Sequence, residues 1–234
     1  RNLDDIFALQ DEIAQKITNL LREHLGESDH GEQLIKAPTL DFGAYESYLR
    51  GLFYFNQWGH EGMSKAIPFF LDAIEKDPAF ALPHARLAVC YVIQTFGGKL
   101  SWEEAHKKGN IHIERIRELG IETAESCFAE AVIEIFYKWD WAGAVKATRK
   151  GLELFPNFAG LYHVLSTLYY ISGDMHEAIR THKIGFELDP MSVEMVFFMG
   201  IAYLWNGEFD KAMPYLQRVV DMIPGNRNAW EYIG

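Results

Sequence analysis

Apolar side chains along the first 25 residues recur at helical intervals. They form a stripe on one side of a helix about six turns long, and they are Ile6, Phe7, Ile13, Ile17, Leu21 and Leu25. An amphipathic helix buries such a stripe against another surface. We therefore expect residues 1–25 to pack on helices elsewhere in this chain or in a neighbouring one, and to form the joint to an upstream domain. Residues 26–41 are expected to form a polar linker.

After residue 41 the pattern becomes a repeat of 34 residues. Proline, alanine and tyrosine keep this spacing at Pro156, Pro190 and Pro224, at Ala144, Ala178 and Ala212, and at Tyr169 and Tyr203. A repeat of this length and punctuation resembles the tetratricopeptide repeat (TPR), a helix–turn–helix unit that stacks into a superhelix.

Small residues stand where the two helices of each unit would cross. They are Gly51, Ala88, Ser166 and Gly200 in the first helices, and Ala66, Ala144, Ala178 and Ala212 in the second. Small side chains let two helices approach closely while bulky neighbours fill the surrounding space. The glycines of "SGD" at 172–174 and "NGE" at 206–208 supply the turns, and Asp174 has capping-box spacing to Glu177.

The earlier units depart from the repeat. The second carries an insertion around "FGGKLSWEEAHKKGN", in which Ser101 and Glu104 have the spacing of a capping box that opens a long helix ending near Gly120. Pro68 and Pro214 fall at equivalent positions inside second helices, where each removes a backbone hydrogen bond.

The pattern predicts an all-α fold: a right-handed α–α superhelix of about five TPR helix pairs, preceded by the amphipathic amino-terminal helix. The expected array covers residues 42–225. Residues 226–234 resemble the start of a truncated sixth repeat, in which Trp230, Ile233 and Gly234 keep the register.

A sharper resemblance comes from the order of several segments. "LDDIFALQDEIAQKI", "AYESYLRGLFYFNQ", "KAIPFFLDAIEKDPAFALPHARLAVCY" and "WDWAGA" resemble the region that follows a TolB-like domain in bacterial signalling proteins, including adenylate and guanylate cyclases and transcriptional regulators. The resemblance implies a carboxy-terminal repeat region whose parent is such a cyclase or regulator. It implies no cyclase chemistry here, because no residues match a nucleotide-binding or metal-binding motif of the catalytic domain.

The charge balance excludes two classes of partner. Lys and Arg number 22 against 33 Asp and Glu, a formal net charge of −11, which repels nucleic acid and anionic lipid surfaces. Cys90 and Cys127 lie in apolar helical patterns far apart in the sequence. We interpret them as reduced core residues of a cytoplasmic protein.

Three segments suggest chemistry only weakly. "GGKLS" at 97–101 lacks the hydroxyl residue that follows Lys in a phosphate loop. His176 and His182 are six residues apart and do not share a helix face, so we interpret them as two partly exposed helical histidines. His106, His112 and Glu114 have helical spacing and would need a further ligand from another helix to hold a metal, so we interpret them as a solvated face. We therefore expect no enzyme, no cofactor and no metal in this fragment; an enzyme with an unrecognised site is the distant alternative.

Repeat superhelices bind most often on the concave face lined by the first helix of each unit. The TPR resemblance places these candidate groove residues inward: Val89, Val92, Ile133, Phe136, His163, Thr167, Tyr170, Glu194, Phe197, Ile201 and Leu204. The set contains no Lys, Arg or Asn to bind a peptide carboxylate, so it favours an apolar helical or extended segment of a protein partner. Burial of some of these residues between tightly wound units is the competing interpretation.

Two functions remain open. The first is a non-catalytic module that binds a protein or peptide for a signalling protein. The second is self-association into a homodimer that holds the output domains of the parent together.

Overall fold

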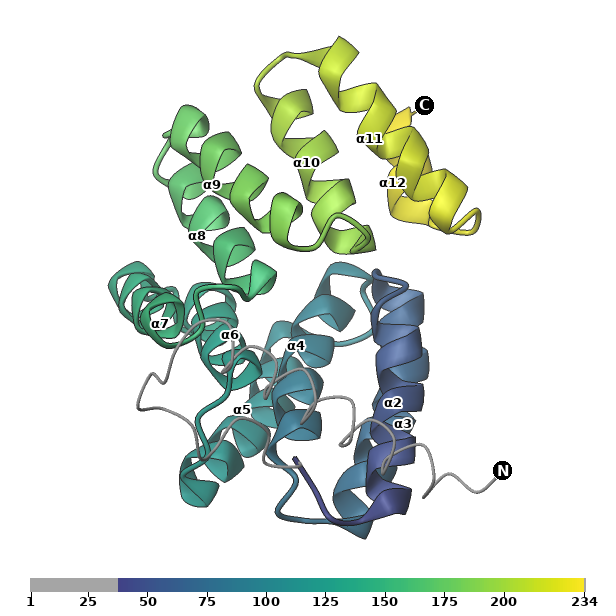
Figure 1. Ribbon diagram of the computed structural model, residues 1–234, viewed down its shortest axis with the longest axis vertical. Helices are drawn as coiled ribbons and strands as arrows, with labels where there is room; N and C mark the ends of the chain where they lie inside the picture. Colours follow the sequence, from purple (N-terminus) through teal and green to yellow (C-terminus); the bar gives the residue numbers. More distant parts are fainter. Residues whose placement is uncertain (1–37, 234) are drawn as a thin grey trace, which may run out of the picture. The chain divides into compact units, whose positions relative to one another are not determined.

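The computed structural model describes residues 38–233, and the amino-terminal helix expected at 1–25 lies outside them. The described part contains eleven α-helices, one π-helix and no strand (Figure 1). The helices are α2 (Phe42–Phe55), α3 (His60–Lys76), α4 (Ala81–Phe96), α5 (Trp102–Leu119), α6 (Ala124–Ile133), the π-helix η1 (Glu134–Lys138), α7 (Trp141–Leu154), α8 (Ala159–Ile171), α9 (Met175–Leu188), α10 (Val193–Trp205), α11 (Phe209–Met222) and α12 (Arg227–Ile233).

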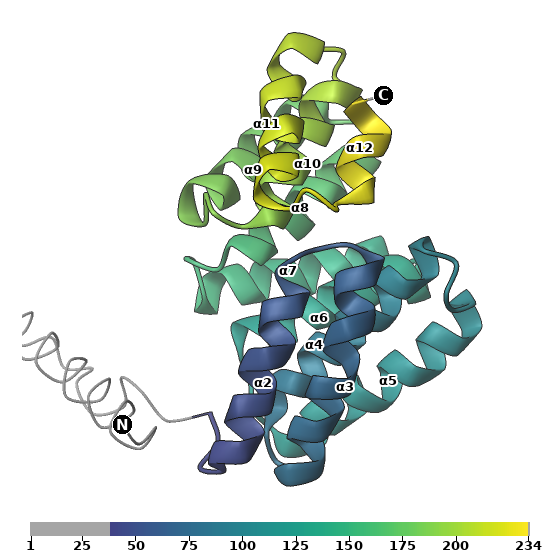
Figure 2. The same ribbon diagram turned by 90° about the vertical axis from the view of Figure 1, so that its right-hand side faces the viewer.

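Consecutive helices pack as hairpins. The pairs α2/α3, α4/α5, α6/α7, α8/α9 and α10/α11 each share extensive contacts, and α12 packs on α11 (Figures 1 and 2). Each hairpin also contacts the next, through α3 and α4, α4 and α6, α7 and α8, and α9 and α10. This order of contacts is that of a helical-repeat array, in which each unit buries its apolar faces against its neighbours.

The small residues let the helices of a hairpin touch, as the sequence predicts. A Cβ atom on Gly51 would lie 2.5 Å from a ring carbon of Phe70 in α3, and one on Gly200 would lie 2.9 Å from Leu216 in α11. Ser166 uses its hydroxyl at the same position to donate a hydrogen bond of 2.8 Å to the carbonyl of Ala178. At the two glycines, a bulky side chain of the second helix therefore packs directly on the backbone of the first.

Capping follows the predictions in one helix and departs from them in another. Ser101 and Glu104 form the complete capping box that opens α5. Asp174 caps α9 through the backbone N–H of Glu177, but the Glu177 side chain does not complete the box. It pairs with Arg180 instead, at 2.6 Å, because a guanidinium one turn away offers a charged donor.

The third unit contains a feature that the sequence pattern does not reveal. The helix of this unit ends in the π-helical turn η1, and Trp139 follows it in the left-handed conformation at φ 55°. A bulky residue rarely adopts this conformation. Wider turns of this kind often occur at functional sites, and residues of η1 do line the groove described below.

The buried side chains form two core clusters. The first extends from α2 to α8, and the second from α10 to α12. Trp58, in the α2–α3 loop, packs against both, and its ring lies 5.8 Å from that of Phe198 in α10. The loop of the first hairpin thus contacts the fifth.

Cys90 and Cys127 are both buried and unpaired. Among the described residues, no helix is long and apolar enough to cross a membrane.

Candidate functional site

A groove of about 550 Å³ follows the first helices of successive hairpins. Residues of α4, α6, η1, α8, α10 and α12 line it, together with Met175, Ala178 and His182 of α9 and the Trp58–Gly59 loop. We call this cavity the groove. It lies on the helices that the repeat pattern assigns to the concave face.

Nine of the eleven candidate residues line the groove. These nine are Val89, Val92, Phe136, His163, Thr167, Tyr170, Glu194, Phe197 and Ile201. Ile133 is absent from the lining and is 1% exposed in the first core cluster, while Val132 and Ile135 line the groove on either side of it. Leu204 is also absent, and its neighbour Trp205 lines the groove instead.

Several of the predicted groove residues form the buried floor of the groove and not its accessible surface. Val89, Val92, Phe197 and Ile201 are all buried. The competing interpretation, burial between tightly wound units, is therefore correct for these four.

The accessible part is a row of aromatic residues that we call the aromatic rim. Each comes from a different first helix, close to its carboxyl end: Phe96 of α4, Phe136 of η1, Tyr170 of α8, Trp205 of α10 and Tyr232 of α12. The exposed fraction is 60% for Phe96, 46% for Trp205, 40% for Tyr232 and 38% for Tyr170.

Two pairs of rim residues contact each other across neighbouring hairpins. The rings of Tyr170 and Trp205 stack with centroids 4.4 Å apart, and those of Phe96 and Phe136 meet edge to face at 5.4 Å. Such pairs restrict one another's rotamers. The rim therefore contains two preformed aromatic pairs, and the fifth residue, Tyr232, contacts Phe197 of the groove floor.

Sequence reasoning missed three of the five rim residues, although the helical period points to them. Phe96 lies seven residues after Val89, and Trp205 lies four after Ile201, so each continues a predicted stripe by one or two turns. Tyr232 stands in the short sixth unit, where no groove residue was assigned. The sequence gives no signal for the residues that α9 contributes to the groove, because their position depends on the rotation between successive hairpins.

The polar groups of the groove centre on His163 and Glu194. Nε2 of His163 lies 3.8 Å from Oε1 of Glu194. That Oε1 and the Nδ1 of His163 are buried without a hydrogen bond. Burial, opposed by Arg86, raises the pKa of Glu194 to about 8, and burial followed by the nearby His182 holds the pKa of His163 well below its usual value.

Arg86 forms its ion pair with a different carboxylate, although its Nε is buried without a hydrogen bond. Its guanidinium pairs with Glu125 at 3.2 Å and lies 4.9 Å from the centre of the Phe55 ring. No Lys or Arg lines the groove.

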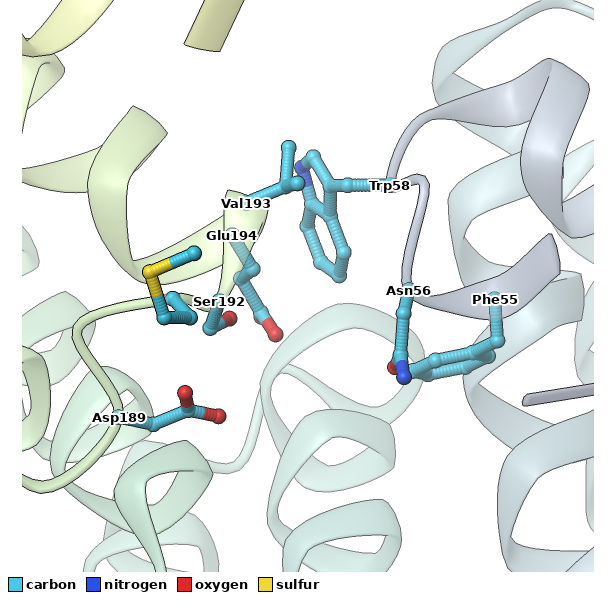
Figure 3. Close-up of a pocket in the computed structure, with 8 residues that line it drawn as sticks. Phe55, Asn56, Trp58, Asp189, Ser192, Val193 and Glu194 are labelled. Carbon is cyan, nitrogen blue, oxygen red and sulfur yellow. The ribbon is translucent and has the colours of Figure 1, made fainter. Parts of the chain in front are cut away.

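A second cavity, of about 270 Å³, lies between the α2–α3 loop and the start of α10. Figure 3 shows the carboxyl group of Glu194 directed into the space between Asp189 and Asn56. We call this cavity the acidic pocket. Its walls are Phe55, Asn56, Trp58, Asp189, Met191, Ser192, Val193 and Glu194.

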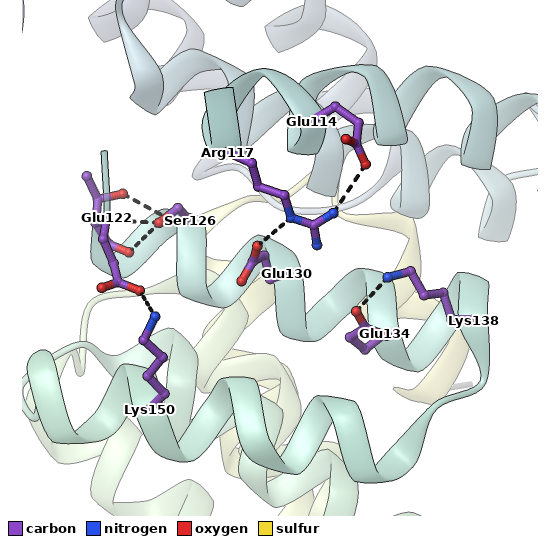
Figure 4. A network of polar contacts seen from close by, with 9 residues as sticks. Glu114, Arg117, Glu122, Ser126, Glu130, Glu134, Lys138 and Lys150 are labelled. Carbon is purple, nitrogen blue, oxygen red and sulfur yellow. Dashed lines mark hydrogen bonds and ion pairs between the residues drawn. The ribbon is translucent and has the colours of Figure 1, made fainter. Parts of the chain in front are cut away.

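The histidines that suggested a metal have other contacts. His112 is buried and not solvated as predicted, because its Nδ1 lies 2.9 Å from Nδ1 of His84 in α4. Glu114 pairs with Arg117, which also bonds Glu130 (Figure 4). Among residues 38–233, no group of three or more His, Cys, Asp and Glu side chains could hold a metal ion.

The two histidines His176 and His182 differ from each other in burial. His176 is exposed, but His182 is buried with its Nε2 3.0 Å from the carbonyl oxygen of Met195. The prediction of two partly exposed rings is wrong for His182, because α10 covers that face of α9.

Solved structures share the helical-repeat fold. TTC0263, a thermophilic TPR protein of Thermus thermophilus, superposes with a TM-score of 0.58 at 14% identity, covering 81% of this chain and 96% of that one. A chain of the APC/C hetero-tetramer Cut9–Hcn1 gives 0.54 at 16% identity, covering 92% of this chain and 37% of that one. The fold is a TPR superhelix.

Sequence comparison adds one relative. No protein-family model matches the chain. It is 23% identical over 194 residues to the transcriptional regulator HilA of Salmonella paratyphi A, a match that covers 82% of this chain and 34% of HilA. The chain thus spans about a third of that protein. The TPR fold expected from the 34-residue period is confirmed, while the resemblance to cyclase-associated repeats stays a prediction.

Proposed function

We propose that this TPR array is a non-catalytic module that binds an apolar segment of another protein along the aromatic rim. The observation that carries the proposal is the exposure of Phe96, Tyr170, Trp205 and Tyr232 in a single groove. Exposed aromatic side chains at such a density are characteristic of binding surfaces.

The composition of the groove supports an apolar segment over a terminal carboxylate. Recognition of a carboxylate needs cationic donors, and the lining residues include no Lys or Arg. A helix with an apolar face, or an extended chain with alternating apolar residues, would place its side chains between successive rim residues.

The test is selection of peptides from a displayed library of amphipathic sequences, followed by affinity measurement on variants. Tyr170→Glu combined with Trp205→Glu should weaken the selected peptides about tenfold or more, because each change places a charge in an apolar contact. Phe209→Glu is the matched control, since Phe209 is 61% exposed and lies in α11 outside the groove.

Failure to select any peptide, or equal binding by the groove variant and the wild type, would refute the proposal. Phe197 is unsuitable for the same test. It is only 6% exposed, so a charge there would unfold the array instead of blocking the surface.

The parent protein is proposed to be a regulator, and the similarity to HilA over a third of its length supports this class. The adenylate or guanylate cyclase parent expected from the opening segments is a second proposal of the same kind. A cytoplasmic location fits two buried cysteines that remain unpaired.

Self-association is the alternative function. It is favoured by Trp139 and Trp141, which are 69% and 37% exposed and pack edge to face at 5.7 Å. Light scattering over a concentration series tests it: a mass that stays monomeric throughout would rule it out.

A further inference from the structure

The acidic pocket adjoins the groove and has a different chemistry. The two cavities share Trp58 and Glu194 as lining residues. A segment that lies in the groove can therefore send one side chain into the pocket.

Two carboxyl groups face the pocket, and no Lys or Arg lines it. Asp189 makes no ion pair among the described residues. Glu194 has a fully buried carboxyl oxygen without a hydrogen bond. Buried polar atoms almost always have a partner, so this carboxyl group indicates a site that is completed by another molecule.

The remaining walls suit a flat cation. Trp58 provides an aromatic ring, and Asn56 and Ser192 provide further polar atoms (Figure 3). The ring of Phe55 already has the guanidinium of Arg86 4.9 Å from its centre, so Trp58 is the aromatic partner for a new cation. Guanidinium groups stack on aromatic rings and donate several hydrogen bonds in one plane, whereas an ammonium is a compact and strongly hydrated charge.

We propose that the acidic pocket binds the guanidinium of an arginine side chain carried by the apolar partner segment. The inference rests on the proposed function for the origin of that arginine, but the pocket can be tested without the partner. Arg86 does not fill this role, because it is held by Glu125 in the neighbouring hairpin.

The ionisation of Glu194 links the pocket to pH. The groups that face it are Arg86 of α4, His163 of α8 and Asp189 before α10. Burial first, and then Asp189, raise the pKa of Glu194 to about 8, while Arg86 acts in the opposite direction. A bound guanidinium stabilises the ionised carboxylate, so binding should release a proton and strengthen as the pH rises through 8.

The probe for the test is N-acetyl-arginine amide, followed by nuclear magnetic resonance of the Trp58 indole and the Asn56 side-chain amide. We expect saturable shifts, with tighter binding at pH 8.5 than at pH 6.5. The citrulline analogue, which is neutral and of the same shape, should give no saturable shift.

Asp189→Asn and Glu194→Gln preserve the size of each side chain and should each weaken binding about tenfold. Asp210→Asn in α11 is the matched control, because Asp210 is exposed and outside the pocket. Circular dichroism confirms that the variants fold.

Several results would overturn the inference. Equal shifts with arginine and citrulline probes, or unchanged binding by both pocket variants, would show that the pocket does not recognise a cation. Equal affinity for N-acetyl-lysine amide would overturn the assignment to a guanidinium. Loss of peptide binding in the rim variant with the arginine affinity retained supports the pocket as an independent site. A protein that binds the selected peptides but not N-acetyl-arginine amide refutes the pocket and leaves the proposed function in place.

Discussion

A pair of buried histidine rings makes the stability of this molecule depend on pH. His84 and His112 are 5% and 8% exposed, and their Nδ1 atoms are 2.9 Å apart. One ring therefore donates and the other accepts. Burial lowers the pKa of both to about 4, assisted by Arg115 at His84 and by His84 at His112.

The sign of the pH dependence follows from these pKa values. Both rings are neutral above pH 6.5 in the folded and unfolded chain, so their contribution is constant there. Between pH 6.5 and about 4, each of these two histidines is protonated in the unfolded chain but neutral in the folded chain. Each ring therefore lowers the free energy of unfolding as the pH falls. Glu194 has the opposite effect, because its raised pKa favours the folded state as the pH falls from about 8.

Replacing one ring of the pair should reduce this loss. In His112→Gln, the decrease in the free energy of unfolding from pH 7 to pH 4.5 should be smaller than in the wild type by about 2 kcal/mol. Urea titrations at a series of pH values measure it. His176→Gln, which changes an exposed ring, should keep the wild-type dependence, and equal dependence in His112→Gln would contradict the burial argument.

At the level of helices, hairpin geometry depends on small residues at the crossing points. The same argument that identified Gly51 and Gly200 from the sequence also explains the closest contacts in the structure. Phe70 lies against the backbone of Gly51 and is completely buried, so neither side of this contact has room to move.

Adding a single methyl group at this contact should therefore destabilise the first hairpin. Gly51→Ala should lower the free energy of unfolding by about 1–3 kcal/mol, since the new Cβ would clash with the Phe70 ring. Gly225→Ala is the control, because no atom lies within 4 Å of the added group. Chemical denaturation measures the free energy of unfolding of both variants. Equal values would show that α2 and α3 can move apart to accept the methyl group without loss of stability.

The sequence predicts local features of the helices better than features that need contacts between them. The capping box at Ser101, the internal prolines Pro68 and Pro214 and the small positions are all present. The π-helical turn had no local signal, since residues 134–138 contain neither Gly nor Pro. The burial of His112 and His182 likewise depends on α4 and α10, which cover them.

At the level of the whole array, the position of the groove was predictable, but its accessible part was not. Nearest-neighbour stacking fixes which helices face inward. Which residues then remain exposed depends on the rotation between hairpins, which buries Val92 and leaves Trp205 accessible. The acidic pocket was not predictable, because it joins loop residues more than 130 positions apart, such as Asn56 and Asp189.

Trp58 should couple the two core clusters, because it packs against both. Trp58→Ala should lower stability by about 2–3 kcal/mol and allow α10 to α12 to unfold before the rest. Hydrogen exchange should show reduced protection in α10 and α11, with α4 unchanged. Trp139→Ala, at a side chain 69% exposed, should leave hydrogen exchange in both regions at the wild-type level. Unaltered exchange in Trp58→Ala would mean that the clusters are coupled by other contacts.

The contact between Trp58 and Phe198 has a mechanical consequence. An open helical-repeat array extends under tension like a spring, since only neighbouring units touch. Here the ring of Trp58 joins the loop of the first hairpin to α10 of the fifth, so stretching must break this contact before the coil can lengthen. Under a pulling force the array should first resist stiffly, yield in one step and only then become compliant.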